Sequence, residues 1–399
     1  MVTTSDRVPR SYWLAYLTGG FGLGLNAMVQ FLVPLRANDL GIGLGTIGLL
    51  LGAKALVESV ASTPVGGLID RVGTRRAFII GTLASALIGL TFTVATTVPQ
   101  LFLLQVGLGL ARPLGWISAQ AFVAGLRKGP NQAQDTGRFS FVATGGQVLA
   151  PLMVGFGAQS FGTGPAFWFF GAYCAIFVVL GLVLPRTDPP PTTKKSQGLI
   201  QGLRLFAIDG IKVAMLLSFA RLWISATWTS FFSLHLVTSG VAEGSAATVV
   251  SAMAIIATAL SPLAGRLARM GREDYLCAAA LACSAVGLAL SPVIDSIPLA
   301  YLGAALIGVG HGLSLPFLLV LVPRAAPEGQ RGLALGLRAG VNQFASSISP
   351  VLTASVIGLA SAGIGFPLAG GIGLAVLGVA TVIARNSQQT AANDGHDTT

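Results

Sequence analysis

Long apolar segments alternate with short polar segments along the whole chain. Each apolar segment has about 20 residues or more, the length that an α-helix needs to cross the hydrocarbon core of a bilayer. A helix also satisfies the backbone polar groups of such a segment without help from water. The pattern predicts an all-α integral membrane protein in a lipid bilayer, with twelve spans near residues 11–34, 42–69, 77–98, 101–126, 138–161, 165–184, 211–238, 245–268, 275–294, 298–322, 332–359 and 363–384.

The longest connection, residues 185–210, divides these spans into six and six. It is charged and contains three consecutive prolines after Asp188, a composition typical of a solvated linker. The segment after Arg385 is rich in Gln, Asn, Asp and Thr, which favours disorder. We therefore expect a six-helix bundle in 1–184, a cytoplasmic linker in 185–210, a second six-helix bundle in 211–385 and a disordered cytoplasmic tail in 386–399.

The composition agrees with a membrane protein, because 53% of the residues are hydrophobic and 10% are charged. Soluble domains carry roughly a quarter of their residues as charged side chains. The net charge of +10 comes from basic residues at alternate ends of the apolar segments, so it predicts topology and no nucleic-acid partner. One set of ends carries Arg7, Arg10, the 71–76 loop, Arg127, Lys128, the linker, Arg266 to Arg272, Arg324, Arg331 and Arg385; the other carries Arg36, Asp39, Glu243 and Asp295.

By the positive-inside rule, this asymmetry places both termini and the linker in the cytoplasm. We expect a multi-pass protein of the plasma membrane, in a bacterium the inner membrane.

Candidate reactive groups are scarce. The three cysteines, Cys174, Cys277 and Cys283, lie within apolar runs without metal-ligand spacing. The chain shows no nucleophile–base set, metal-ligand cluster or phosphate-binding Gly-x4-Gly-Lys motif. We expect no metal, no cofactor and no enzymatic activity.

The loop between the second and third spans carries a distinctive motif, Pro64-Val-Gly-Gly-Leu-Ile-Asp-Arg-Val-Gly-Thr-Arg-Arg76. Its pattern Gly-x-x-x-Asp-Arg-x-Gly-x-Arg-Arg resembles the cytoplasmic loop signature of the major facilitator superfamily, although Thr74 stands where that family usually has a basic residue. The resemblance implies the two-bundle fold of that family and a cytoplasmic gate in this loop. The alternative is a generic positive-inside loop. The gate residues implied are Gly66, Asp70, Arg71, Gly73, Arg75 and Arg76, with Asp135 as a partner for one of the arginines.

An internal repeat supports two related halves. The Pro64 to Gly73 stretch recurs at Pro262 to Gly271, 198 positions later, with Ala268 in place of Asp70. Gly137 and Pro151 recur as Gly336 and Pro350, each 199 positions later. Parallel halves of this kind are typical of transporters that bind substrate at the midplane.

The fifth span carries small residues and a proline at a regular spacing: Gly137, Gly146, Ala150, Pro151 and Gly155. The pattern partly resembles the antiporter motif of superfamily exporters, with Ala150 and Val154 replacing two glycines. The alternative is an ordinary packing seam, since small residues let helices approach closely.

Ionisable side chains inside the spans are expensive to bury, so they usually face a partner or a water-filled cavity. Glu58 and Lys54 lie four residues apart, on one helical face. Desolvation and the neighbouring lysine act on Glu58 in opposite directions, so we expect Glu58 to carry protons, with His311 as a fallback. The alternatives are a structural Lys54–Glu58 pair and a satisfied interior histidine.

Further polar residues in the spans are predicted to line a central substrate cavity. The excess of Lys and Arg would favour anionic or zwitterionic substrates. Arg338 could alternatively snorkel to the membrane surface. The predicted cavity residues are Asn26, Gln30, Arg112, Trp116, Gln120, Gln147, Arg221, Arg338, Asn342 and Gln343.

Together these features predict a monomeric secondary transporter that couples proton movement to the export of small organic molecules such as drugs or metabolites. One alternative is an uptake carrier or symporter for small organic anions. A lipid-handling membrane protein is a less favoured alternative.

Overall fold

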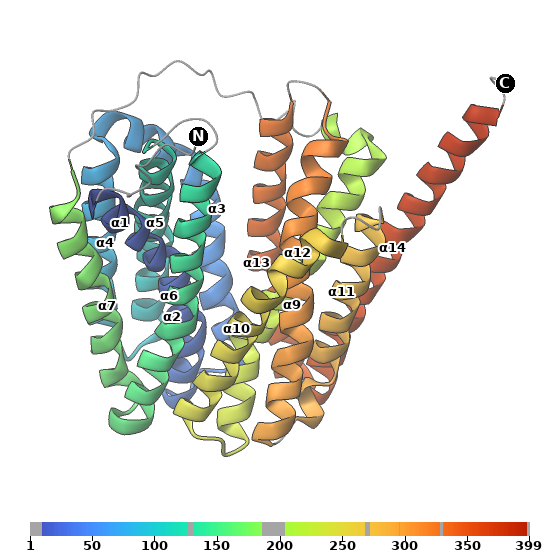
Figure 1. The fold of residues 1–399 in the computed structure, drawn as a ribbon. Coiled ribbons are helices and arrows are strands. Elements are labelled where there is room, and N and C mark those ends of the chain that lie inside the picture. Colours follow the sequence, from blue (N-terminus) through green and yellow to red (C-terminus); the bar gives the residue numbers. More distant parts are fainter. Residues whose placement is uncertain are drawn as a thin grey trace. The chain divides into compact units, whose positions relative to one another are not determined.

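The computed structural model describes residues 10–126, 131–185, 204–267, 272–294, 296–327 and 330–396, and these residues form helices joined by short turns (Figure 1). The chain divides into two compact units, residues 1–40 with 57–193, and residues 41–56 with 194–399. The first helices of the chain are α1 (Arg10–Leu17), α2 (Gly19–Asp39), α3 (Leu44–Val72), α4 (Thr74–Phe92), α5 (Val98–Ala124), α6 (Asn131–Phe161) and α7 (Thr163–Val183). The later ones are the 3₁₀ turn η1 (Leu205–Ala207), α9 (Asp209–Thr238), α10 (Glu243–Leu267), α11 (Glu273–Ala289), the 3₁₀ turn η3 (Ser291–Val293), α12 (Ile297–Ala325), α13 (Arg331–Leu359) and α14 (Ala362–His396).

The structure confirms an all-α membrane protein. Among the described residues, ten helices are long and apolar enough to cross a bilayer. The other two predicted spans correspond to α11, which has 17 residues, and to α13, which has 29 residues but is interrupted by polar side chains such as Arg338 and Asn342.

Several helices extend beyond the predicted spans because hydropathy does not detect polar helical turns. α5 begins at Val98, where Thr97 and Gln100 form a capping box. α6 begins at Asn131, seven residues before the predicted start, in a polar stretch. α14 continues to His396, whereas the sequence predicted that the tail after Arg385 would be disordered. The sequence 386–394 contains no glycine or proline to end the helix.

The first unit is held together by a close contact among α2, α6 and α7. A Cβ added at Gly146 of α6 would lie 2.9 Å from the Cα of Gly20 on α2, so the two backbones touch. The Tyr173 hydroxyl of α7 donates to the Gly20 carbonyl at 2.6 Å and covers Gly24. Small residues at these positions allow van der Waals packing that larger side chains would prevent.

In the second unit, α9 is the most enclosed helix and packs against α12, α13 and α14. Trp223 of α9 donates Nε1 to the Ala369 carbonyl of α14 at 2.9 Å, and Ser349 of α13 donates to the Trp223 carbonyl at 3.0 Å. The start of α3 also belongs to this unit. A Cβ at Gly48 would lie 2.6 Å from the Pro350 carbonyl oxygen of α13.

Adjacent glycines of α6 provide a matched test of the α2–α6 contact. Gly146→Ala should destabilise the protein by about 1–3 kcal/mol, because the added methyl group meets backbone that cannot move aside. Gly145→Ala should be neutral or slightly stabilising, since its Cβ meets no atom within 4 Å and alanine favours the helix. Thermal unfolding in detergent compares the two variants, and equal melting temperatures would contradict the close contact.

Candidate functional site

The loop motif of residues 64–76 forms the end of α3, the start of α4 and the junction between them. Gly73 alone connects the two helices and has a φ of 87°, in the left-handed region that glycine adopts without steric cost. A Cβ added at Gly66 meets no atom within 4 Å, so packing does not require glycine there. The backbone conformation of the junction therefore accounts for Gly73 of the motif.

The arginines of this junction take different positions. Arg75 donates from Nε to the Gly181 carbonyl at 3.1 Å and from Nη2 to the Leu182 carbonyl. These carbonyls belong to the last turn of α7, where a helix lacks internal partners. Arg71 and Arg76 are exposed, and the side chain of Asp70 lies outside the described part of the chain. Arg75 thus ties the start of α4 to the end of α7.

Asp135 is fully buried on α6 and accepts a hydrogen bond from the Tyr16 hydroxyl of α1 at 2.6 Å. Arg138, one turn further along α6, lies over the rings of Trp13 and Tyr16, with centroid distances of 5.5 and 5.8 Å. The structure therefore links Asp135 to α1, a contact that the sequence did not predict. Its pairing with an arginine of the 71–76 loop stays a prediction.

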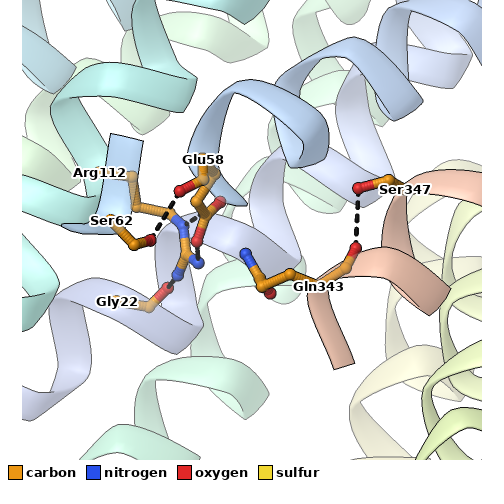
Figure 2. A network of polar contacts seen from close by, with 6 residues as sticks. All are labelled: Gly22, Glu58, Ser62, Arg112, Gln343 and Ser347. Atoms are coloured by element: carbon orange, nitrogen blue, oxygen red, sulfur yellow. Dashed lines mark hydrogen bonds and ion pairs between the residues drawn. The ribbon is translucent and has the colours of Figure 1, made fainter. Parts of the chain in front are cut away.

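Figure 2 shows a buried ion pair within the first unit, between Arg112 of α5 and Glu58 of α3. Arg112 donates from Nε to Glu58 Oε2 at 3.1 Å and from Nη2 to Glu58 Oε1. Its third nitrogen, Nη1, donates to the Gly22 carbonyl of α2 at 2.9 Å. Arg112 is 8% exposed and Glu58 is 5% exposed. Every nitrogen of the guanidinium group therefore has an acceptor, in the two-bond geometry that favours a carboxylate.

Aromatic packing positions the third acceptor of this site. A Cβ at Gly22 would collide with the indole of Trp116, which stacks on Phe139 with ring centroids 5.5 Å apart. Trp116 lies four residues after Arg112 and hence on the same face of α5. Trp116, predicted as a cavity residue, thus packs against the backbone that accepts from Arg112.

Lys54 is also buried, at 5% exposure, one helical turn before Glu58. The sequence associated Glu58 with Lys54 alone and assigned Arg112 to the substrate. The structure adds Arg112 as a further cation for the same carboxylate, and it is bonded directly to Glu58.

The second unit contains a different polar contact. Arg221 of α9 and His311 of α12 approach within 2.9 Å, from Nη2 to Nε2. The sequence placed these residues in separate groups, as a substrate ligand and as a fallback proton carrier. The structure brings them together.

The remaining predicted cavity residues lie on α2, α5, α6 and α13. Gln120 is exposed, whereas Asn26 and Gln30 are partly buried. On α13, the Gln343 carbonyl accepts from the Ser347 hydroxyl at 2.7 Å (Figure 2). The partly buried members are Asn26, Gln30, Gln147, Arg338, Asn342 and Gln343. Their assembly into one substrate cavity stays a prediction.

The antiporter-like motif of α6 has a packed centre and an open start. Gly146 touches α2, whereas a Cβ at Gly137 meets no atom within 4 Å. Ala150, Pro151 and Gly155 are buried. The centre of the motif therefore acts as a packing seam, and a role in export stays a prediction.

One buried polar residue was missed by the sequence analysis. Gln105 of α5 is fully buried, and both polar atoms of its amide lack hydrogen-bond partners. It lies seven residues before Arg112, which places both side chains on nearly the same helical face. That spacing was the available signal, and the uncharged side chain made it easy to overlook.

A polytopic helical bundle with buried charges at membrane depth defines a membrane transport protein more readily than any other class. Residues 12–350 match the Major Facilitator Superfamily, and the chain belongs to this family of transporters. The predicted family resemblance is confirmed.

Curated relatives include transporters named for drug resistance. The chain is 23% identical over 339 residues to Multidrug resistance protein 1 of Bacillus subtilis, covering 82% of this chain and 84% of that protein. It is 27% identical over 177 residues to the quinolone resistance protein NorA of Staphylococcus aureus, a match that covers 44% of this chain and only 45% of NorA. Among solved structures, a bacterial homologue of the human lysosomal transporter Spinster aligns with a TM-score of 0.75 at 16% identity, covering 98% of this chain and 99% of that one.

A double-mutant cycle tests the Arg112–Glu58 pair. Arg112→Leu and Glu58→Gln should each destabilise the protein, and the double variant should lose less than their sum by about 1–3 kcal/mol, because each single change strands a buried partner. Unfolding in detergent measures the three variants. The Lys212–Asp209 pair, whose side chains are 39% and 49% exposed, is the control and should give a coupling of about 1 kcal/mol or less. Strict additivity at Arg112 and Glu58 would contradict the pair.

Proposed function

We propose that this protein is a proton-coupled exporter of small organic molecules in which Glu58 carries the proton. The observation that carries the proposal is the Glu58–Arg112 pair, a carboxylate buried to 5% exposure inside a membrane-length helix. Among the acidic residues of the membrane-length helices described, Glu58 is the one that is both buried and bonded to a cation. An ionisable group in that setting is a functional-site candidate by default.

The geometry supports a simple exchange between proton and cargo. The ionised Glu58 holds Arg112 through two charge-assisted hydrogen bonds. A proton added to Glu58 removes the negative charge, so the bonds weaken and the guanidinium group becomes available to a polar group of the cargo. Loss of the proton restores the pair and displaces the cargo. Lys54, also buried, lies one turn before Glu58 on the same helix and adds a second positive charge near the site.

Further observations support the direction of transport, the membrane topology and the monomeric state. Two relatives are named for resistance to drugs, which supports export of the cargo. The positive-inside pattern supports cytoplasmic termini in a plasma membrane, and one chain contains the whole proposed mechanism, which supports a monomer. The second candidate is symport of small organic anions, favoured by the cationic residues Arg221 and Arg338.

Proteoliposomes with an imposed pH gradient test the proton carrier. Norfloxacin, a fluorescent quinolone with a carboxylate and an amine, is the probe. In the wild type, norfloxacin should move against the direction of proton flow; movement with the protons would support the symporter and overturn export. Glu58→Gln should abolish this gradient-driven flux and retain exchange of labelled for unlabelled probe, because glutamine cannot release a proton.

Glu243→Gln is the matched control, since Glu243 lies in the first turn of α10 and takes no part in the pair. It should transport at the wild-type rate. Gradient-driven flux at full rate in Glu58→Gln would remove Glu58 from coupling and leave it a structural partner of Arg112.

The gate assignment gives a contrasting expectation. Asp70→Asn should slow both gradient-driven flux and exchange, because a gate is used in every cycle whereas the proton carrier is needed for coupling alone. The basic residues that set topology remain, so insertion should be normal. Wild-type rates in both assays, at normal expression, would show that Asp70 has no gating role.

A further inference from the structure

A second group of basic side chains lies in the second unit, and none of them makes an ion pair with an acid in the described part of the chain. Arg221 of α9 is 8% exposed, and His311 of α12 and Arg338 of α13 are partly buried. The three helices pack against one another. Arg221 is twelve residues into α9, about 18 Å from its start, and therefore lies deep within that helix.

The hydrogen bond between Arg221 and His311 fixes the state of the histidine. A guanidinium group can only donate, so Nε2 of His311 must accept and Nδ1 must carry the ring proton. Nδ1 is buried and has no hydrogen-bond partner. The histidine therefore presents a neutral N–H donor that nothing in the described part of the chain accepts.

Two more donors in the same group are also unpaired. Nε of Arg221 and Nε of Arg338 are buried and lack partners in the described part of the chain, and the helices that carry them, α9 and α13, pack together. Each unpaired donor of a charged group is costly to bury. Three buried N–H groups, one on each of three helices, therefore lack acceptors in the described part of the chain.

No carboxylate of the described residues supplies these acceptors. α12 and α13 contain no acidic residue, and the one acid of α9, Asp209, pairs with Lys212 at 2.7 Å at the start of that helix. On α11, which also packs against α9, Glu273 pairs with Arg324, and Asp274 accepts a hydrogen bond from Gln388. This contrasts with Arg112 in the first unit, whose nitrogens all have acceptors. Two like charges without a counter-ion at membrane depth are unfavourable unless an anion joins them.

We propose that Arg221, His311 and Arg338 bind the oxyanion, a carboxylate or a phosphate ester, of a small organic cargo. The planar guanidinium groups and the Nδ1–H donor suit the oxygens of such an anion. Asn342 adds a further feature, because it lies four residues after Arg338, on the same helical face, and its Oδ1 is buried and unpaired. The cargo should therefore carry a hydroxyl or amine donor near its anionic group.

This site deepens the proposed transport function, since it names the class of the cargo, but binding can be measured without transport. The experiment uses the full chain in detergent, with no gradient, and isothermal titration with salicylate, its neutral amide salicylamide, phenyl phosphate and inorganic phosphate. Salicylate or phenyl phosphate should bind, and salicylamide should bind at least about tenfold more weakly, because it lacks the charge.

The variants separate the proposed ligands from general cationic charge. Arg221→Gln and Arg338→Gln should each weaken binding of the organic anion about 10- to 100-fold, as expected for loss of a hydrogen bond to a charged group. His311→Leu should also weaken it, whereas His311→Gln should retain part of the affinity, because an amide can both accept from Arg221 and donate to the anion. Arg385→Gln, at an exposed position of α14, is the control and should bind as the wild type does.

Three outcomes overturn the proposal: equal binding of salicylate and salicylamide, binding of inorganic phosphate alone, or wild-type affinity in folded Arg221→Gln and Arg338→Gln. If Arg221→Gln does not fold, Arg338→Gln and the two His311 variants decide. Failure of proton coupling at Glu58 would leave these binding results unchanged, so the two proposals can fail independently.

Discussion

A charged side chain at the depth of the hydrocarbon core needs an opposite charge or a dense set of polar ligands, and this constraint governs both units of the protein. The first unit meets this constraint internally, because all three nitrogens of Arg112 donate hydrogen bonds, to Glu58 and to the Gly22 carbonyl. The second unit meets it in part, because among the described residues the bonded partner of Arg221 is a neutral histidine. The Arg112–Glu58 pair is closed because its donors all have acceptors, and the cluster of Arg221, His311 and Arg338 is open because some of its donors do not.

The two arrangements suit different tasks. A closed carboxylate–guanidinium pair changes its strength when one proton arrives, which is a property that coupling requires. An open cluster of donors lacks acceptors of its own, so it gains strongly when an anion supplies oxygens. Under the two proposals, the pair at Glu58 responds to the proton and the cluster at Arg221 recognises the anionic group of the cargo.

The apolar pattern was sufficient to predict the helices, since a bilayer allows few alternatives for a 20-residue apolar segment. It could not predict the ends of α6 or α14, where polar turns continue a helix beyond the apolar stretch. Depth within a span identified Glu58, Arg112, Arg221 and His311 individually. It could not pair Arg112 with Glu58, 54 positions away, or Arg221 with His311, because pairing depends on which helix faces are neighbours. Gln105 carries no charge and so gave no signal of its own.

Close backbone packing determines how firmly the pair in the first unit is held. Gly22 lies between Gly20 and Gly24, which contact Gly146 and Tyr173. The same short stretch of α2 therefore forms the seam with α6 and α7 and supplies the carbonyl that accepts from Arg112. A side chain on either neighbouring glycine would shift this carbonyl, and a displaced acceptor would leave one guanidinium N–H unpaired at membrane depth. The glycines of α2 thus link tight helix packing to the position of the carbonyl that accepts from Arg112, and through Arg112 to the ion pair with Glu58.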